Sequence, residues 1–263
     1  RGRLEADEPE PDHPARSEYL GISGPEAGYW LWSGMVIDHR LQPMILLDGP
    51  GRAVAAFTTR AQRLAHWINA YNTLVARGII ALDIRRSIWD VPDFFDRIRL
   101  RAGNLVFSLN EIEHGLLRGN RPHPLSTGVP FPIGDPRLAH AIAPLEPRIH
   151  FAISCGARSC PQVQTYDPAG LDEQLDEATR AFVNRGVVLE GQTVTASPIF
   201  HWFRADFEEA PGGLAGFLVR YLEDGPARRA IVEHGLGHIA WGAYDWRVVP
   251  PGQALGGQED GWI

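Results

Sequence analysis

Apolar residues recur at helical spacing over one long segment of the chain, Thr59–Leu82. They form a single face, which consists of Leu64, Trp67, Ile68, Tyr71, Leu74 and Val75. This pattern predicts a long amphipathic helix. Asn69 and Asn72 lie three residues apart on its flank, where they can either make structural hydrogen bonds or line a cleft.

Two pairs of short apolar segments flank turn residues, and each pair predicts a β-hairpin. Ile98–Leu100 pairs with Leu105–Phe107 around a glycine-containing turn, and Val187–Leu189 pairs with Thr193–Thr195 in the same way. Further elements are predicted from the same patterns. They are helices at Leu171–Phe182, 199–208 and 213–235, and strands at Arg148–Ser154 and Tyr244–Val249.

A capping box follows the first hairpin. Ser108 and Glu111 have the spacing of this motif and predict a helix that runs to about Arg118. At about 100° per residue, Glu113 lies close to the centre of the apolar stripe of this helix, and His114 lies on its flank. A carboxylate in that position is partly desolvated and needs a partner.

Short, mostly antiparallel strands beside long helices indicate an α+β fold, with helices packed on a small sheet. Residues 1–18 are rich in Pro, Glu and Asp, which predicts a disordered tail or linker. Residues 19–263 are expected to form a single globular domain. Within it, 19–50 is expected to be partly helical and 119–147 a long surface loop.

Charge and composition exclude several classes of function. The net charge is −7, and the basic residues form no stripe, which argues against a nucleic-acid partner. All basic side chains are Arg, and the chain contains no Lys, so Schiff-base and P-loop lysine chemistry are excluded. No apolar run is long enough to predict a membrane span.

The candidate chemistry centres on the two cysteines, Cys155 and Cys160. The pattern places Cys155 at the end of the strand predicted at Arg148–Ser154. Pro161 favours a helix start, which makes Cys160 a candidate N-cap whose thiol pKa would be lowered by the helix dipole and by Arg158.

Three roles for Cys160 stay open on the sequence: a nucleophile, a structural thiol or disulfide with Cys155, and a metal ligand. A nucleophile needs a base, for which His114 is the first candidate and His150 the second. Glu113 and His114 diverge around their helix, so which of them faces the thiol is open. We expect no cofactor and assign no metal ligand.

Five motifs occur in the same order in a known family. They are Trp67-Ile68-Asn69-Ala70-Tyr71-Asn72, Ser108 through Arg118, Ile149-His150-Phe151 through Cys155-Gly156-Ala157-Arg158-Ser159-Cys160-Pro161, Ile199-Phe200-His201-Trp202-Phe203-Arg204-Ala205-Asp206-Phe207, and Tyr244-Asp245-Trp246. Over about 60–246 the chain resembles domain-of-unknown-function family 547. At 201–203 it departs from the usual basic-Trp-Tyr pattern of the family and lacks one hydroxyl group.

The resemblance implies a bacterial, often exported protein, which suggests a periplasmic or extracellular location without excluding the cytoplasm. It also singles out polar positions, namely Asn69, Asn72, Glu113, His114, Cys155, Cys160, Arg204, Asp206 and Asp245. The Cys and His content, rather than a motif match, suggests a papain-like or transglutaminase-like form of the α+β fold.

The favoured interpretation is a cysteine-dependent hydrolase or acyltransferase that acts on an amide, peptide or ester. Its alternatives are a non-catalytic protein-interaction module with a structural Cys pair and a Cys/His metal-binding domain. The predicted catalytic residues are Cys160, Cys155, His114 and Glu113. The predicted substrate-binding residues are Asn69, Asn72, Arg158 and Arg204. The expected partner is a small molecule or peptide substrate.

Overall fold

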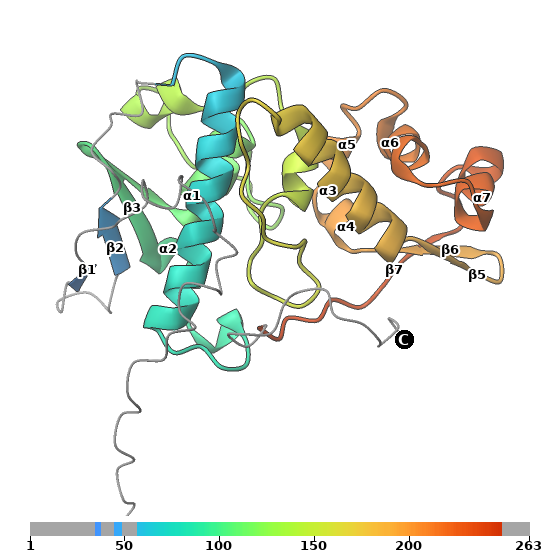
Figure 1. Cartoon of the computed structure of the whole chain (residues 1–263), viewed down its shortest axis with the longest axis horizontal. Coiled ribbons are helices and arrows are strands. Elements are labelled where there is room, and N and C mark those ends of the chain that lie inside the picture. Colours follow the sequence, from blue (N-terminus) through green and yellow to red (C-terminus); the bar gives the residue numbers. More distant parts are fainter. Residues whose placement is uncertain (1–34, 38–44, 49–56, 249–263) are drawn as a thin grey trace, which may run out of the picture.

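The computed structural model describes residues 35–37, 45–48 and 57–248, which form helices and two small sheets (Figure 1). The α-helices are α1 (Arg60–Ala81), α2 (Phe94–Arg97), α3 (Leu171–Gly186), α4 (Ile199–Trp202), α5 (Arg204–Phe207), α6 (Gly213–Tyr221) and α7 (Pro226–His234). The strands are β1 (Met35–Ile37), β2 (Ile45–Asp48), β3 (Ile98–Ala102), β4 (Leu105–Ser108), β5 (Val188–Glu190), β6 (Thr193–Ala196) and β7 (Ile239–Trp241). The shorter helical segments are η5 (Ile88–Asp90), η6 (Glu111–Leu117), η7 (Pro136–His140) and η8 (Pro147–Phe151).

Helix α1 is the long helix that the apolar spacing predicts. It begins after Thr59, whose side chain accepts a hydrogen bond from the backbone N–H of Gln62, while the Gln62 side chain accepts from the N-cap backbone. This reciprocal capping box fixes the first turn. Most of the helix beyond its first turn is buried, so α1 is the central element of the first hydrophobic cluster.

The first sheet has the order β1-β2-β3-β4, in which β2 and β3 are parallel and the other neighbours antiparallel. The predicted hairpin of β3 and β4 is confirmed, with Gly103 at φ +64° in its turn. The partial helix expected at 19–50 is wrong where the structure describes that stretch, because Met35–Ile37 and Ile45–Asp48 are strands. The tail expected at 1–18 lies outside the described residues.

The second half of the chain forms another hydrophobic cluster, drawn to the right of α1 in Figure 1. It contains α3, α6, α7 and the sheet β5-β6-β7, in which the predicted hairpin β5–β6 is confirmed and β7 adds in parallel. The last strand falls at Ile239–Trp241 instead of the predicted Tyr244–Val249. Arg247 and Val248 make only isolated bridges, to Ser87 and Ala157.

The strand predicted at Arg148–Ser154 is wrong. Residues Pro147–Phe151 form a short 3-10 helix, η8, because Glu146 caps it through the backbone N–H of Arg148 and Pro147 stands in its first turn. Alternating apolar residues predicted a strand with one buried face, but both faces of this segment are buried. Ile149 packs into the first hydrophobic cluster and Phe151 into the second, so η8 joins the two.

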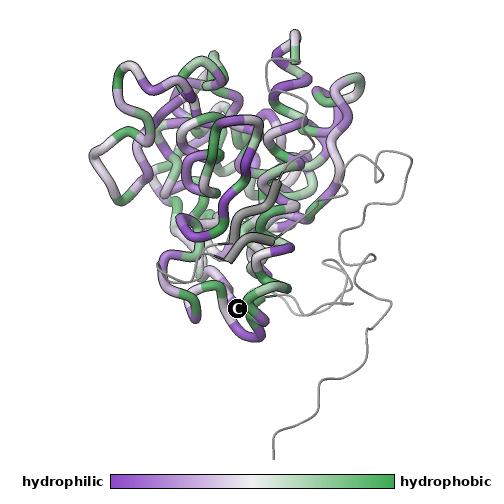
Figure 2. Tube along the Cα trace, turned by 90° about the vertical axis from the view of Figure 1, so that its left-hand side faces the viewer, coloured by the Kyte–Doolittle hydropathy of each residue, from purple (hydrophilic) through white to green (hydrophobic). Residues whose placement is uncertain are grey.

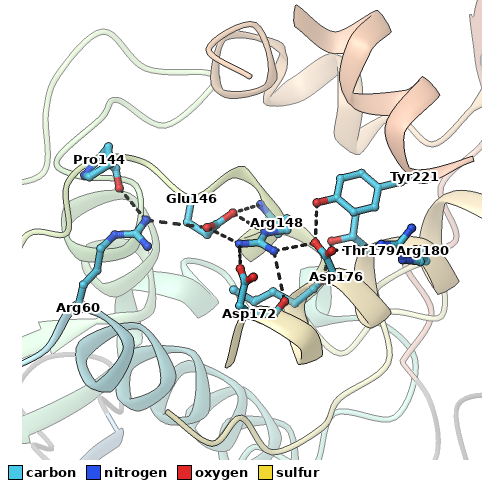
Figure 3. A network of polar contacts seen from close by, with 10 residues as sticks. Arg60, Pro144, Glu146, Arg148, Asp172, Asp176, Thr179, Arg180 and Tyr221 are labelled. Carbon is cyan, nitrogen blue, oxygen red and sulfur yellow. Dashed lines mark hydrogen bonds and ion pairs between the residues drawn. The ribbon is translucent and has the colours of Figure 1, made fainter. Parts of the chain in front are cut away.

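Arg148 extends this junction into a network of ion pairs (Figure 3). Its guanidinium contacts Glu146 at 2.8 Å, Asp172 at 2.6 Å and Asp176 at 2.7 Å. The Tyr221 hydroxyl of α6 donates to Asp176 at 2.7 Å. The network therefore connects η8, α3 and α6.

Hydrophobic and hydrophilic residues are interleaved along the described trace (Figure 2). Among the helices that the structure describes, none combines the length and the apolar character needed to cross a membrane. The α+β class, with helices and small, mostly antiparallel sheets, is confirmed.

Candidate functional site

The turn that carries both cysteines is held between α1 and the segment near the end of the described chain. The backbone N–H groups of Arg158 and Ser159 donate to the carbonyls of Arg247 and Asp245, at 2.9 and 3.2 Å. Gly156 adopts φ +83°, and a Cβ atom added there would lie 2.4 Å from Ile79 Cδ1 of α1. Glycine is thus required at this position by both backbone conformation and space.

The two sulfur atoms share one hydroxyl group. Tyr244 Oη lies 3.0 Å from Cys160 Sγ and 3.7 Å from Cys155 Sγ. The backbone N–H of Cys155 also donates to Cys160 Sγ at 3.1 Å. Both cysteines are free thiols, Cys160 with 4% of its surface exposed and Cys155 partly buried.

These contacts shift the pKa values of the two thiols in opposite directions. Burial raises the pKa of Cys160, but hydrogen bonds from the Cys155 thiol, the Tyr244 hydroxyl and the Cys155 backbone outweigh it and lower that pKa to about 7. The pKa of Cys155 is raised, because its thiol donates to Cys160 and is itself buried. Cys160 is therefore the thiol that loses its proton first.

The cause of the low Cys160 pKa differs from the prediction. No helix follows Pro161 in the structure, since residues 161–167 are irregular, so Cys160 is not a helix N-cap. Arg158 is exposed and contributes its backbone to the turn. Direct hydrogen bonds at the sulfur take the place of the expected helix dipole.

Tyr71 connects the cysteines to the helix that carries Glu113. Its hydroxyl, on α1, donates to Glu113 Oε2 at 2.9 Å. Burial raises the pKa of Tyr71, and the negative charges of Glu113, Cys155 and Cys160 raise it further. Tyr71 therefore binds Glu113 directly and is influenced by the charges of both cysteines.

The helix at Glu111–Leu117 is a π-helix rather than the predicted α-helix. The predicted capping box is present, with Ser108 N–H donating to Glu111 Oε2 at 2.8 Å. The helix closes by i→i+5 bonds, such as Arg118 N–H to the Glu113 carbonyl at 2.8 Å. Such segments often occur at functional sites, and this one turns both Glu113 and His114 inward.

His114, the fourth predicted residue, is held by Arg118. Arg118 Nη1 lies 3.0 Å from His114 Nδ1, and Glu113 Oε1 lies 3.9 Å from the same nitrogen. Burial lowers the pKa of His114 to about 4 despite Glu113. Because Arg118 can only donate, neutral His114 accepts at Nδ1 and carries its proton on Nε2.

Asp206 is the centre of the buried charge cluster behind His114. It accepts two hydrogen bonds from Arg118, at 2.6 and 3.0 Å, and lies 2.9 Å from His150 Nε2 and 3.2 Å from Arg121. Burial raises the pKa of Asp206, but bonds from His150 and Arg118 lower it well below its usual value. Burial lowers the pKa of His150, so neutral His150 donates its Nε2–H to the carboxylate.

Phe203, the position at which the chain lacks the expected hydroxyl, covers this cluster. Its ring stacks on His150 with centroids 4.1 Å apart, and the guanidinium of Arg118 lies 4.9 Å from the ring centroid. The ring therefore shields the pair of Arg118 and Asp206 and strengthens its electrostatic interactions.

Asn69 and Asn72 both bind backbone. Asn72 Nδ2 donates to the Ala152 carbonyl and its Oδ1 accepts from Ser154 N–H, each at 2.9 Å. Asn69 makes the same pair of bonds, also at 2.9 Å, to the backbone of Tyr166. The two amides fasten the segments before and after the cysteine turn to α1.

Two predicted polar residues lie at the surface. Arg204 is exposed and pairs with Glu208 at 2.9 Å. Asp245 pairs with Arg247, and its backbone N–H donates to Ser159 Oγ at 2.7 Å. Asp245 thus helps to hold the cysteine turn, whereas Arg204 binds within its own helical segment.

A cavity of about 340 Å³ adjoins the cysteine turn between α3 and the segment after Cys160. Its lining residues are Phe151, Pro161, Gln162, Gln164, Glu177, Ala178, Ala181, Phe182 and Arg185. Its volume falls within the range of small-ligand pockets. In the part of the chain that the structure describes, no group of three His, Cys, Asp or Glu residues is arranged to hold a metal ion.

Sequence reasoning missed three residues of the site: Tyr71, Tyr244 and Arg118. Tyr71 counted only as part of the apolar face of its helix, although it is the one hydroxyl-bearing residue there. Tyr244 and Arg118 lie within two of the five family motifs, so the motifs already pointed to these residues. The contacts of Tyr71 with Glu113, of Tyr244 with the cysteines and of Arg118 with Asp206 join residues 42 to 89 positions apart, which no local pattern shows.

Together these features define an α+β protein with a hydrogen-bonded pair of thiols and a separate buried cluster of His, Arg and Asp. Residues 55–183 match the family model described as "Protein of unknown function, DUF547", so this stretch of the chain is similar to that family. The matched stretch includes the first three motifs, and the last two lie beyond it. Comparison with curated proteins and with solved structures finds no match.

Proposed function

We propose that the protein is a cysteine-dependent hydrolase or acyltransferase that acts on an amide or ester, including peptides, with Cys160 as the nucleophile. The observation that carries the proposal is the hydrogen bonding of Cys160 Sγ by Tyr244 Oη and the Cys155 N–H. Both groups stabilise the thiolate, which is the reactive form of cysteine.

In the proposed reaction the thiolate attacks the carbonyl carbon of the substrate, and a C–S bond forms. Backbone N–H groups of the cysteine turn stabilise the resulting oxyanion. The intermediate then expels an amine or alcohol, which takes up a proton, and leaves a thioester on Cys160. Water or a second nucleophile cleaves the thioester and returns the sulfur to its thiolate form.

His114 is the proposed proton carrier, and His150 is the alternative. Because the Cys160 pKa is already lowered, attack needs no base, and a proton is needed only by the leaving group. Neutral His114 can orient a water molecule through its Nε2–H. That water gives its proton to the leaving group, and the hydroxide that is formed attacks the thioester in the second half of the reaction. Arg118 orients the imidazole, in the role that Glu113 or an Asn was expected to fill.

The cavity beside Pro161 is the proposed site for part of the substrate. Its walls combine the apolar side chains of Phe151, Ala178 and Phe182 with amide and charged groups at Gln164 and Arg185. Asn69 and Asn72, expected to bind substrate, are proposed to position the cysteine turn instead, through their bonds to the backbone.

A relation to papain-like or transglutaminase-like thiol enzymes is part of the same proposal. It rests on the Cys and His content of the chain, with Cys160 as the proposed nucleophile. We also propose that the protein is bacterial and located in the periplasm or outside the cell, with the cytoplasm as the alternative. This placement rests on the family resemblance alone, and fractionation of the native host tests it.

Alkylation with iodoacetamide tests the nucleophile. In the folded protein at pH 7, Cys160 should react faster than free glutathione, because more of it is thiolate. Cys160→Ser should abolish the fast reaction and Cys155→Ser should keep a labelled Cys160. Incubation with a p-nitrophenyl ester should then leave a thioester on Cys160 that mass spectrometry detects.

Slow alkylation of both cysteines, no faster than that of glutathione, would contradict the proposal. With no thioester formed either, the result would favour a non-catalytic interaction module in which the cysteines are structural. Stoichiometric metal in purified protein, lost together with thiol protection on chelation, would favour the metal-binding alternative.

A further inference from the structure

The two thiols differ in their hydrogen bonds and in their exposure, and the proposed hydrolysis gives Cys155 no role. Cys155 and Cys160 both contact Tyr244 Oη, and the backbone N–H of Cys155 donates to Cys160 Sγ. Cys155 is also more exposed than Cys160. A second thiol in direct reach of a stabilised thiolate has no necessary part in acyl transfer.

We propose that Cys155 is a resolving cysteine, which forms a reversible disulfide with Cys160 after a hydroperoxide has oxidised Cys160. This inference shares Cys160 with the proposed function but does not depend on hydrolysis. It requires only that the two sulfurs are close and that the turn between them can close.

The turn between the two cysteines is short and already bent. The Cys160 N–H donates to the Ala157 carbonyl at 3.0 Å, so the chain already folds back on itself between the two cysteines. Gly156, at φ +83°, bends the backbone next to Cys155. Disulfides require the Cα atoms to lie within about 7 Å, and a turn of this kind brings them close.

The first step oxidises the sulfur by two electrons. The Cys160 thiolate attacks one oxygen of the hydroperoxide, the O–O bond breaks, and the leaving oxyanion takes a proton from water to give an alcohol or, from hydrogen peroxide, water. The product is a sulfenic acid on Cys160. Hydrogen peroxide is small enough to reach a side chain that is largely buried.

The second step forms the disulfide. The Cys155 sulfur attacks the sulfenic sulfur, the S–O bond breaks, and the hydroxyl leaves as water with the proton of the Cys155 thiol. Two thiols of an external reductant restore the original pair by thiol–disulfide exchange. The disulfide removes the nucleophile of the proposed acyl transfer and protects Cys160 from irreversible oxidation to sulfinic acid.

Mass spectrometry of the peroxide-treated full chain tests the proposal. Trypsin cleaves after Arg158, between the two cysteines, so a disulfide joins two tryptic peptides that separate on reduction. The wild-type protein should yield this joined pair, and dithiothreitol should reverse it. Cys155→Ser should instead accumulate dimedone-reactive sulfenic acid and then sulfinic acid on Cys160, about tenfold more than wild type.

Cys160→Ser is the matched control and should show neither the joined peptides nor fast oxidation of Cys155. The proposal is overturned if wild type and Cys155→Ser form sulfinic acid on Cys160 at the same rate, or if both thiols stay reduced. None of these readouts needs turnover of a substrate. Failure of the redox proposal is therefore distinguishable from failure of the hydrolytic one.

Discussion

At the scale of single residues, two tyrosine hydroxyls organise the site. Tyr244 contacts both sulfurs, and Tyr71 donates to Glu113 from the side of α1. The Tyr71 side chain is buried and the Tyr244 side chain is partly buried, which limits competition from water. A hydrogen bond to a buried charge is stronger than one made in solvent, so each hydroxyl has a large effect on its partner.

Replacement of Tyr244 by Phe should raise the pKa of Cys160 above its value of about 7. A hydrogen bond to a charged group contributes about 1.5–3 kcal/mol, and one pH unit corresponds to about 1.4 kcal/mol, so we expect a rise of about 1–2 pH units. The pH dependence of iodoacetamide alkylation measures it. Tyr221→Phe, which removes a hydroxyl bound to Asp176, is the control and should leave the profile unchanged. An unchanged midpoint in Tyr244→Phe would show that this hydroxyl does not stabilise the thiolate.

At the scale of elements, the site uses helices of unusual pitch. The segment that carries Glu113 and His114 is a π-helix, and the segment that carries His150 is a 3-10 helix. The apolar spacing predicted an α-helix and a strand for them. The spacing of apolar residues shows which residues are buried, but these two segments are buried on several sides, so the spacing does not reveal the helical period. Capping and neighbouring side chains decide the pitch. One such neighbour is Phe131, which leaves no room for a Cβ atom at Gly115.

Substitution of Gly156 by Ala should destabilise the protein and displace the cysteine turn. A positive φ costs a non-glycine residue about 1–2 kcal/mol, and the clash with Ile79 Cδ1 adds about 1–3 kcal/mol of overpacking. Gly103→Ala is the matched control, because Gly103 also has a positive φ but no atom lies within 4 Å of an added Cβ. Urea denaturation measures both variants. Equal losses would show that the contact with α1 is unimportant, and Ile79→Ala should partly rescue Gly156→Ala.

At the scale of the whole molecule, polar networks join the two hydrophobic clusters at the site. Asp206 of α5 binds Arg118, which follows η6, and His150 of η8, while Arg148 of η8 binds α3. The cysteine turn starts directly after η8. The position of the thiols therefore depends on how the two halves of the chain dock.

Replacement of Asp206 by Asn should cost about 3–5 kcal/mol of unfolding free energy, because it leaves the buried guanidinium of Arg118 without its counter-charge. The folded pKa of Asp206 is lowered, so its stabilising contribution is fully present above the unfolded pKa of about 4 and is lost as the pH falls through the folded pKa. Asp172→Asn, which removes an exposed carboxylate from Arg148, should cost less than about 1 kcal/mol. Urea denaturation at pH 7 compares them, and a small loss for Asp206→Asn would contradict the structural role of the cluster.

The sequence by itself determined the α+β class, α1, both hairpins, α3, the capping box at Ser108 and the family resemblance over 55–183. These follow from short-range causes, namely side-chain periodicity, capping and turn chemistry. Only the tertiary structure decided what Cys160 binds, that Asn69 and Asn72 hold backbone, and that Arg118 and Asp206 form one buried cluster. Those contacts join residues far apart along the chain, and their partners are selected by the packing of whole elements, which no local pattern encodes.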